Sequence, residues 1–153
     1  WMKTELLEIG KKDISKFVIT KSLRGYYKNP EQIAHKVLAD RMTERDPGNK
    51  PKANDRIPYA YIELPDEVLY DMDNPYKSGP RKGKPRERAV KQGDRIEHVD
   101  YIKEHNKRLD YAFYITNQIM NPVKQVLDLK MDPKKTEEIF TNILEELKSN
   151  TDV

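Results

Sequence analysis

Apolar residues recur at helical spacing in three stretches of the chain, residues 29–44, 109–129 and 132–147. Side chains three and four positions apart lie on one face of a helix, so each stretch predicts an amphipathic helix. Pro122 lies inside the second stretch and predicts a kink there, because it has no N–H to bond to Gln118. The apolar positions are Ile33, Ala34, Val37, Leu38 and Met42 in the first stretch, Ala112, Ile115, Ile119, Val123, Val126 and Leu127 in the second, and Ile139, Phe140, Ile143, Leu144 and Leu147 in the third.

Capping residues and shorter patterns predict further helices and their ends. The pair Asn29-Pro30 is typical of a helix start, with asparagine as the N-cap and proline in the first turn. Residues 4–9 are expected to end a helix at Gly10, which suits the left-handed position after a helix. A short helix is expected over residues 99–105.

Two β-rich stretches predict strands at residues 17–20 and 56–62. Pro58 lies in the second and cannot donate to a ladder, so this strand is expected at a sheet edge or a bulge. Gly93-Asp94 predicts a turn. The expected fold class is therefore α+β, mostly α-helical, with a small antiparallel sheet.

Charge is spread unevenly along the chain. Residues 21–56 hold nine basic and five acidic side chains, and residues 77–95 hold eight basic and two acidic ones. Between them, residues 61–75 hold five acidic side chains and no basic one, and residues 131–153 hold three basic and six acidic ones. Clustered lysine and arginine are typical of a polyanion partner, and a solvated surface explains the same pattern equally well. Residues 64–91 are rich in proline, glycine and charge and predict a long flexible insertion.

Composition excludes several classes of protein. Hydrophobic residues and charged residues each make up 36% of the 153 residues, and the mean hydropathy is −0.95. A thin core is expected, of the kind that leans on another domain. The sequence has no run of about 18 apolar residues and no leader pattern, so neither a membrane span nor a signal peptide is expected. The absence of cysteine excludes disulfides, thiol catalysis and cysteine-bound zinc. The start at Trp1 suggests a segment of a longer protein.

No catalytic motif is visible in the sequence. Gly79 and Gly83 follow no predicted strand, so they do not form a phosphate-binding loop. Asp71 and Asp73 form a carboxylate pair that would suit Mg²⁺ on adjoining strand ends, but they lie in the predicted insertion, where a solvated acidic loop is favoured. The three histidines, His35, His98 and His105, show no metal-binding spacing.

Several blocks occur in a fixed order along the chain: Asp13 to Leu23 (DISKFVITKSL), Tyr27 with Asn29-Pro30, His35 to Met42 (HKVLADRM), Gly93 to Ile96 (GDRI) and Tyr111 to Pro122 (YAFYITNQIMNP). In this order and spacing they resemble the thumb of family B DNA polymerases, above all the delta-type enzymes and their relatives in large DNA viruses. The resemblance covers about residues 4–130. Neither the palm's Asp-Thr-Asp box nor the fingers' Lys/Asn-Ser helix of that family occurs in the sequence.

The resemblance implies that residues 1–153 are the thumb domain of a DNA-directed DNA polymerase, with residues 64–91 as a flexible insertion and residues 131–153 as a C-terminal acidic helix. A thumb grips primer–template double-stranded DNA and has the palm and fingers of the same enzyme as neighbours. The catalytic residues and the Mg²⁺ ions belong to the palm, so this chain is expected to hold no catalytic residue, metal or cofactor. The implied location is the nucleus or a viral replication compartment.

The candidate DNA-binding residues combine this resemblance with the chemistry of phosphate contacts, which come from basic side chains, hydroxyl groups and helix N-termini. Lys21, Ser22, His35 and Arg41 match the family pattern best. Arg41 lies inside an apolar helix face, so its head reaches either water or a partner. Tyr111, Tyr114 and Gln118 are expected mainly in the core. The full candidate set is Lys21, Ser22, Arg24, Tyr27, Lys28, His35, Arg41, Arg45, Lys50, Lys52 and Arg56.

Two other functions stay open at this point. One is a non-enzymatic nucleic-acid-binding module, and the other is a protein–protein adaptor that uses the acidic C-terminal helix. A sliding clamp is a further candidate partner of that helix, but the absence of a clamp-binding motif favours packing on the thumb. The basic run in the insertion either contacts DNA, serves as a nuclear import signal or is solvated, and solvation is favoured.

Overall fold

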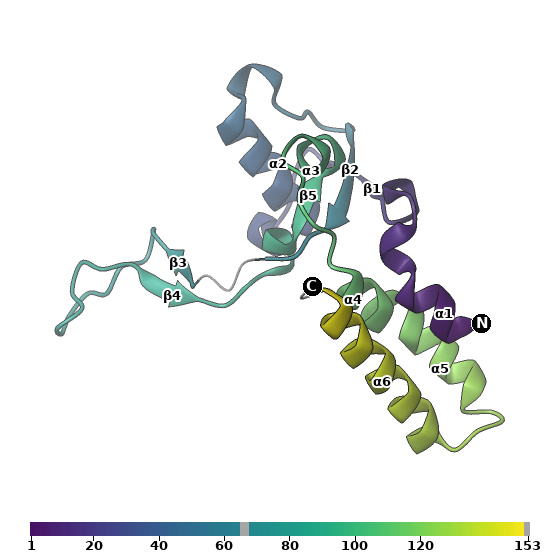
Figure 1. Cartoon of the computed structure of the whole chain (residues 1–153). Coiled ribbons are helices and arrows are strands. Elements are labelled where there is room, and N and C mark those ends of the chain that lie inside the picture. Colours follow the sequence, from purple (N-terminus) through teal and green to yellow (C-terminus); the bar gives the residue numbers. More distant parts are fainter. Residues whose placement is uncertain (65–67, 152–153) are drawn as a thin grey trace. The chain divides into compact units, whose positions relative to one another are not determined.

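The computed structural model describes residues 1–64 and 68–151 and contains two compact units (Figure 1). The first unit combines Trp1–Val18 with the chain from Leu109 onward, and the second is Ile19–Arg108. Helices dominate and the sheets are antiparallel, which confirms the α+β prediction. None of the helices in these residues is both long enough and apolar enough to cross a membrane. The assignment of the whole chain to one thumb domain stays a prediction.

The named elements of the first unit, within the residues that the structure describes, are all helices. Its core is formed by Phe17, Tyr114, Ile115, Phe140 and Ile143, all buried. The Tyr114 hydroxyl donates to the Phe17 carbonyl oxygen at 2.8 Å and so joins the two chain segments that form this unit. The elements are α1 (Met2–Leu7), two short 3-10 helices (Ile9–Lys11 and Ile14–Lys16), α4 (Tyr111–Tyr114), a π-helix (Ile115–Met120), α5 (Asn121–Leu127) and α6 (Pro133–Thr151).

The two N-terminal predictions for this unit need correction. α1 ends at Leu7, and Gly10 lies inside a 3-10 turn instead of following the helix in a left-handed conformation. Residues 17–18 belong to the first unit, and the predicted strand begins only at Ile19. Both errors arise because a glycine and a β-rich run indicate an element's presence better than its ends.

The 109–129 stretch is helical but changes its hydrogen-bonding pattern before Pro122. The π-helix ends at Met120, and proline follows in the first turn of α5. Val126 is 65% exposed, contrary to the predicted stripe, whereas Val123 and Leu127 of that stripe are half-buried.

The C-terminal helix α6 follows the predicted amphipathic pattern. Asp132 accepts a hydrogen bond from the Lys134 backbone N–H at 2.9 Å and so caps the helix. Phe140 and Ile143 are buried, and α6 packs on α1 and α5. α6 thus packs within the first unit, and whether this unit is part of a thumb stays a prediction.

The second unit is built on a three-stranded antiparallel sheet in the order β1-β2-β5. The strands are β1 (Ile19–Ser22), β2 (Arg56–Tyr61) and β5 (Ile96–His98). Two helices contact this sheet, α2 (Ala34–Arg45) and α3 (Val99–Glu104). The core is formed by Leu38, Ile57, Ala60, Ile96 and Ile102.

Pro58 does not lie on an edge strand, so that prediction is wrong. β2 is the central strand, and Pro58 pairs with Thr20 of β1. On its other side β5 pairs only with Tyr59–Tyr61. Pro58 therefore lies beyond the end of β5, where its missing N–H breaks no ladder bond.

The start of α2 also differs from the prediction. Pro30–Gln32 form a separate 3-10 turn, Asn29 makes no side-chain cap hydrogen bond, and α2 begins at Ala34. The predicted turn at Gly93 is a 3-10 turn, Gln92–Arg95. A Cβ at Gly93 would lie 2.8 Å from the Val37 Cβ, so this turn needs glycine to pack against α2.

The predicted insertion contains a β-hairpin. β3 (Leu69–Asp71) pairs with β4 (Arg86–Arg88) in a sheet of its own (Figure 1). Residues 65–67 of the insertion lie outside the described residues. Whether the hairpin is mobile stays a prediction.

Candidate nucleic-acid interface

Two backbone segments that are hydrogen-bonded to each other carry six exposed basic residues of the second unit. Ser22 pairs with Arg56 in the β1–β2 ladder. Beyond the ladder, the Leu23 N–H donates to the Asp55 carbonyl oxygen at 2.9 Å, and the Asn54 N–H donates to the Leu23 carbonyl oxygen at 2.8 Å. Segments 21–28 and 50–56 are therefore joined at residues 22–23 and 54–56. We call the group on these segments the cationic surface; its members are Lys21, Arg24, Lys28, Lys50, Lys52 and Arg56.

No member of the cationic surface forms an ion pair within the part of the chain that the structure describes. Their like charges repel one another, so a polyanion that replaced their counterions would bind favourably. A shallow hollow of about 460 Å³ is lined by Lys50, Lys52 and Arg56 together with His98. Asp55 also lines it, but one of its carboxylate oxygens accepts the Lys52 backbone N–H at 2.8 Å. The hollow is thus predominantly basic.

Tyr27 and His35 support the loop that carries Arg24. The Arg24 backbone N–H donates to the Tyr27 hydroxyl at 2.8 Å, and that hydroxyl lies 3.1 Å from His35 Nε2. Burial is the main cause that lowers the pKa of His35 below its ordinary value of 6.5, and the charges of Lys21 and Arg24 lower it further. His35 is therefore neutral at neutral pH and holds the loop by hydrogen bonding, next to two cations of the surface.

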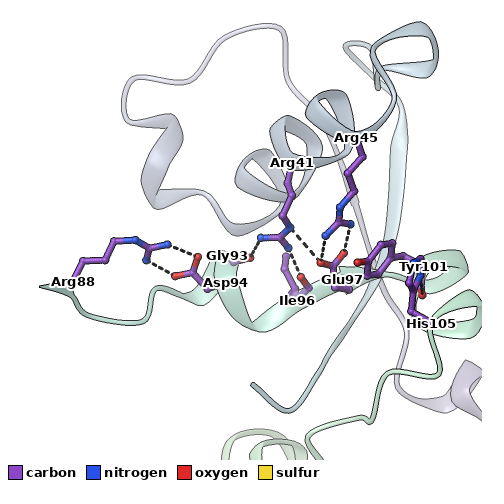
Figure 2. A network of polar contacts seen from close by, with 9 residues as sticks. All are labelled: Arg41, Arg45, Arg88, Gly93, Asp94, Ile96, Glu97, Tyr101 and His105. Carbon is purple, nitrogen blue, oxygen red and sulfur yellow. Dashed lines mark hydrogen bonds and ion pairs between the residues drawn. The ribbon is translucent and has the colours of Figure 1, made fainter. Parts of the chain in front are cut away.

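Arg41 and Arg45 differ from the cationic surface, because both side chains bind other residues of the second unit (Figure 2). Arg41 Nη1 donates to the Gly93 carbonyl oxygen at 3.2 Å, and Nη2 donates to that of Ile96 at 2.5 Å. Arg45 forms a bidentate pair with Glu97, with distances of 3.0 and 2.8 Å. The proposed DNA contact of either arginine stays a prediction, but neither belongs to the cationic surface.

Glu97 is the centre of this buried network. It is 5% exposed, and besides Arg45 it has Arg41 Nε at 3.2 Å from a carboxylate oxygen, without the angle of a hydrogen bond. The hydrogen bond to Glu97 is the main cause that raises the pKa of Arg45. The Arg45 guanidinium also lies 3.8 Å from the centre of the Tyr101 ring, whose other neighbour is the stacked ring of His105. The network ties α2 to β5 and α3.

A second ion pair fixes the end of the insertion. Arg88 of β4 forms a bidentate pair with Asp94 at 2.6 and 2.9 Å (Figure 2). The hydrogen bond from Arg88 is the main cause that lowers the pKa of Asp94 below its ordinary range. This pair anchors β4 to the Gln92–Arg95 turn, and no sequence motif predicted it.

The remaining candidates divide between structural roles. Tyr114 is buried in the first unit's core, as predicted, while Tyr111 is half-buried and Gln118 is exposed. Asp71 accepts the Asp73 backbone N–H at 3.2 Å within a turn. Among the described residues there is no group of three histidine, cysteine or acidic side chains arranged to hold a metal ion.

Comparison with known proteins matches nearly the whole chain to one family. The sequence profile of DNA polymerase family B matches residues 2–130. The chain is similar to the DNA polymerase of Acanthamoeba polyphaga mimivirus, with 44% identity over 88% of this chain, and to that of Pyramimonas orientalis virus, with 48% identity over 80%. It is also similar to the DNA polymerase delta catalytic subunit of Candida albicans, with 27% identity over 84%. The match covers 7%, 8% and 10% of those three proteins, so the chain spans a tenth or less of each.

Proposed function

Because this chain belongs to DNA polymerase family B, we propose that it is the thumb of a DNA-directed DNA polymerase and grips the primer–template duplex. The cationic surface is the observation that carries this proposal. Six exposed basic side chains that form no ion pair with any described residue suit the phosphates of a duplex whose sequence varies, since phosphate contacts carry no sequence information. Ser22, between Lys21 and Arg24, adds a hydroxyl donor to the same segment.

In this proposal the bond-forming chemistry lies elsewhere in the parent enzyme. Its palm holds Mg²⁺ and the catalytic carboxylates, and its fingers and palm are the thumb's neighbours. A sliding clamp and a nuclear or viral replication compartment fit the same role. The thumb contributes by slowing the release of product DNA, because each phosphate contact adds to affinity independently of sequence.

The test is duplex binding by the purified chain over a range of salt concentrations. If all six members of the cationic surface contact phosphates, a plot of log affinity against log salt has a slope of about −5. The variant Lys21→Ala/Arg24→Ala/Lys52→Ala is expected to reduce that slope by about 2.7. A matched variant, Lys130→Ala/Lys134→Ala/Lys135→Ala, removes three exposed lysines of the first unit and leaves the slope unchanged.

Equal losses in the two triple variants would contradict a localised grip, and no duplex binding at low salt would contradict the thumb proposal itself. Binding to a protein partner in place of DNA would favour the adaptor function. In the parent polymerase, the Lys21/Arg24/Lys52 variant is expected to lower the number of nucleotides added per binding event more than the rate of a single insertion.

A further inference from the structure

The tip of the β3–β4 hairpin has a shape that its backbone defines. The Tyr76 N–H donates to the Lys84 carbonyl oxygen at 3.0 Å, and the Gly83 N–H donates to that of Tyr76 at 2.9 Å. Gly79 and Gly83 both have φ of +82°, a conformation that favours glycine. Backbone bonds and these two glycines therefore hold the loop that carries the side chains at the tip.

Those side chains are strongly basic. Residues 74–86 contain no acidic residue. Lys77, Arg81, Lys82 and Lys84 are exposed, and none forms an ion pair within the described ranges, 1–64 and 68–151. Four unpaired cations on one short loop repel each other, and a phosphodiester backbone would relieve that repulsion.

Aromatic rings lie next to these cations. A hollow of about 310 Å³ is lined by Tyr70, Tyr76, Arg81, Lys84, Pro85 and Glu87. The Arg86 guanidinium lies 5.2 Å from the centre of the Tyr76 ring, whereas Tyr70 is 50% exposed and makes no ring contact in the described structure. Glu87 lies directly across from Tyr70 in the ladder and disfavours a phosphate there. The hollow thus has a cationic side toward the tip and an aromatic ring at the other side.

We propose that this hairpin binds single-stranded DNA, with phosphates on Lys77, Arg81, Lys82 and Lys84 and one unpaired base stacked on Tyr70. Basic grooves that track the backbone, with aromatic rings for the bases, are the common arrangement for such strands. A duplex fits less well, because its base faces are covered by stacked neighbours. The site is separate from the cationic surface and does not depend on it.

The Arg88–Asp94 pair attaches the proposed single-stranded DNA site to the rest of the second unit. It joins β4 to the Gln92–Arg95 turn, which itself packs against α2. Single-stranded DNA bound at the hairpin would therefore be held on the second unit.

The experiment measures binding of fluorescein-labelled oligo(dT) to the full chain by anisotropy. Tyr70→Ala is expected to weaken binding roughly tenfold, since stacking one base contributes on that order. Tyr70→Phe keeps the ring and should restore affinity to within about twofold. Trp1→Ala is the matched control, because Trp1 is 92% exposed and lies in the first unit; it should have no effect. Arg81→Ala/Lys82→Ala/Lys84→Ala should reduce the salt slope by about 2.

The inference is overturned if the wild-type chain does not bind oligo(dT) at low salt, or if the Tyr70→Ala and triple variants bind as tightly as wild type. It is also overturned if the hairpin variants lose duplex affinity and oligo(dT) affinity equally. The Lys21→Ala/Arg24→Ala/Lys52→Ala variant separates the two proposals. Loss of duplex binding in that variant, together with retained oligo(dT) binding, supports both sites, whereas unchanged duplex binding contradicts the proposed grip and leaves the hairpin result standing.

Discussion

Replacing Glu97 by glutamine tests whether the buried network holds the second unit together. The change removes the negative charge and leaves the shape of the side chain nearly intact. Arg41 and Arg45 then face an amide in place of the carboxylate that both approach within 3.2 Å. Two guanidinium groups in a partly buried site would lose their common counter-charge.

The magnitude follows from burial. Removing one partner of a fully buried ion pair costs about 3–5 kcal/mol, because the other charge stays buried without compensation. Glu97 is buried, but the Arg41 and Arg45 side chains are 24% and 34% exposed, so water compensates part of the loss. We therefore expect Glu97→Gln to lower the free energy of unfolding of the second unit by about 2–4 kcal/mol.

The same unit offers a matched control. Glu63 pairs with Arg108 at 3.6 Å, and their side chains are 42% and 52% exposed. Exposed pairs contribute little, so Glu63→Gln is expected to change stability by less than about 1 kcal/mol.

Amide hydrogen exchange during urea titration is the suitable assay, because it follows residues 19–108 separately from the first unit. Protection of the Ile62 amide, which donates to the Arg95 carbonyl oxygen at 2.9 Å beside the network, is a direct reporter. Equal effects of Glu97→Gln and Glu63→Gln would refute the reasoning, which rests on the burial of Glu97 and on its two arginine partners.

Three further predictions concern pH and packing. Arg88 lowers the pKa of Asp94 below its ordinary 3.8, so the stabilisation that the Arg88–Asp94 pair provides is present above about pH 4 and is lost as the pH falls through the lowered pKa. Asp94→Asn should therefore flatten the acid limb of a stability–pH curve, and an unchanged acid limb would exclude this pair as its source. DNA phosphates would offset the charges of Lys21 and Arg24, which help to lower the pKa of His35, so duplex binding should take up a proton and strengthen as the pH falls into the range where His35 is protonated. His35→Asn should bind with a flatter pH profile, and His105→Gln should bind as wild type does. Gly93→Ala should destabilise the second unit by about 1–3 kcal/mol in the exchange assay, and adding Val37→Ala should recover part of that loss; a variant as stable as wild type would mean that the turn shifts freely away from α2.

Local pattern and composition were sufficient for some elements. The apolar spacing of α6 predicted its buried face correctly, because a helix of this length repeats one face over several turns. The predicted start of this helix at residue 132 also agrees with the structure, in which Asp132 accepts a hydrogen bond from the Lys134 backbone N–H. Element ends were less predictable, as the start of α2 and the end of α1 show, since several residues in a row satisfy the rules for a cap.

The candidate site shows a similar division. Six of the basic candidates predicted from the sequence lie on two segments that are hydrogen-bonded to each other in the structure. The hydrogen bonds of Leu23 with Asn54 and Asp55, which join these segments, could not be predicted from local pattern. Arg41 and Arg45 were predicted in the same set, because the sequence around an arginine on a helix does not show whether its side chain binds a partner or its own chain. Their contacts with DNA, like those of the other candidates, stay predictions.

By itself the sequence determined the amphipathic helices, the uneven charge and the family to which the chain belongs, because each of these is written in neighbouring residues or in their order. Only the tertiary structure decided which charges are free. Arg45 and Glu97 are 52 positions apart in the chain and meet because the β2–β5 ladder sets Glu97 beneath α2. A contact of that kind forms only when distant segments pair, and the pairing is stabilised by the folded unit as a whole. No single stretch of the sequence therefore predicts it.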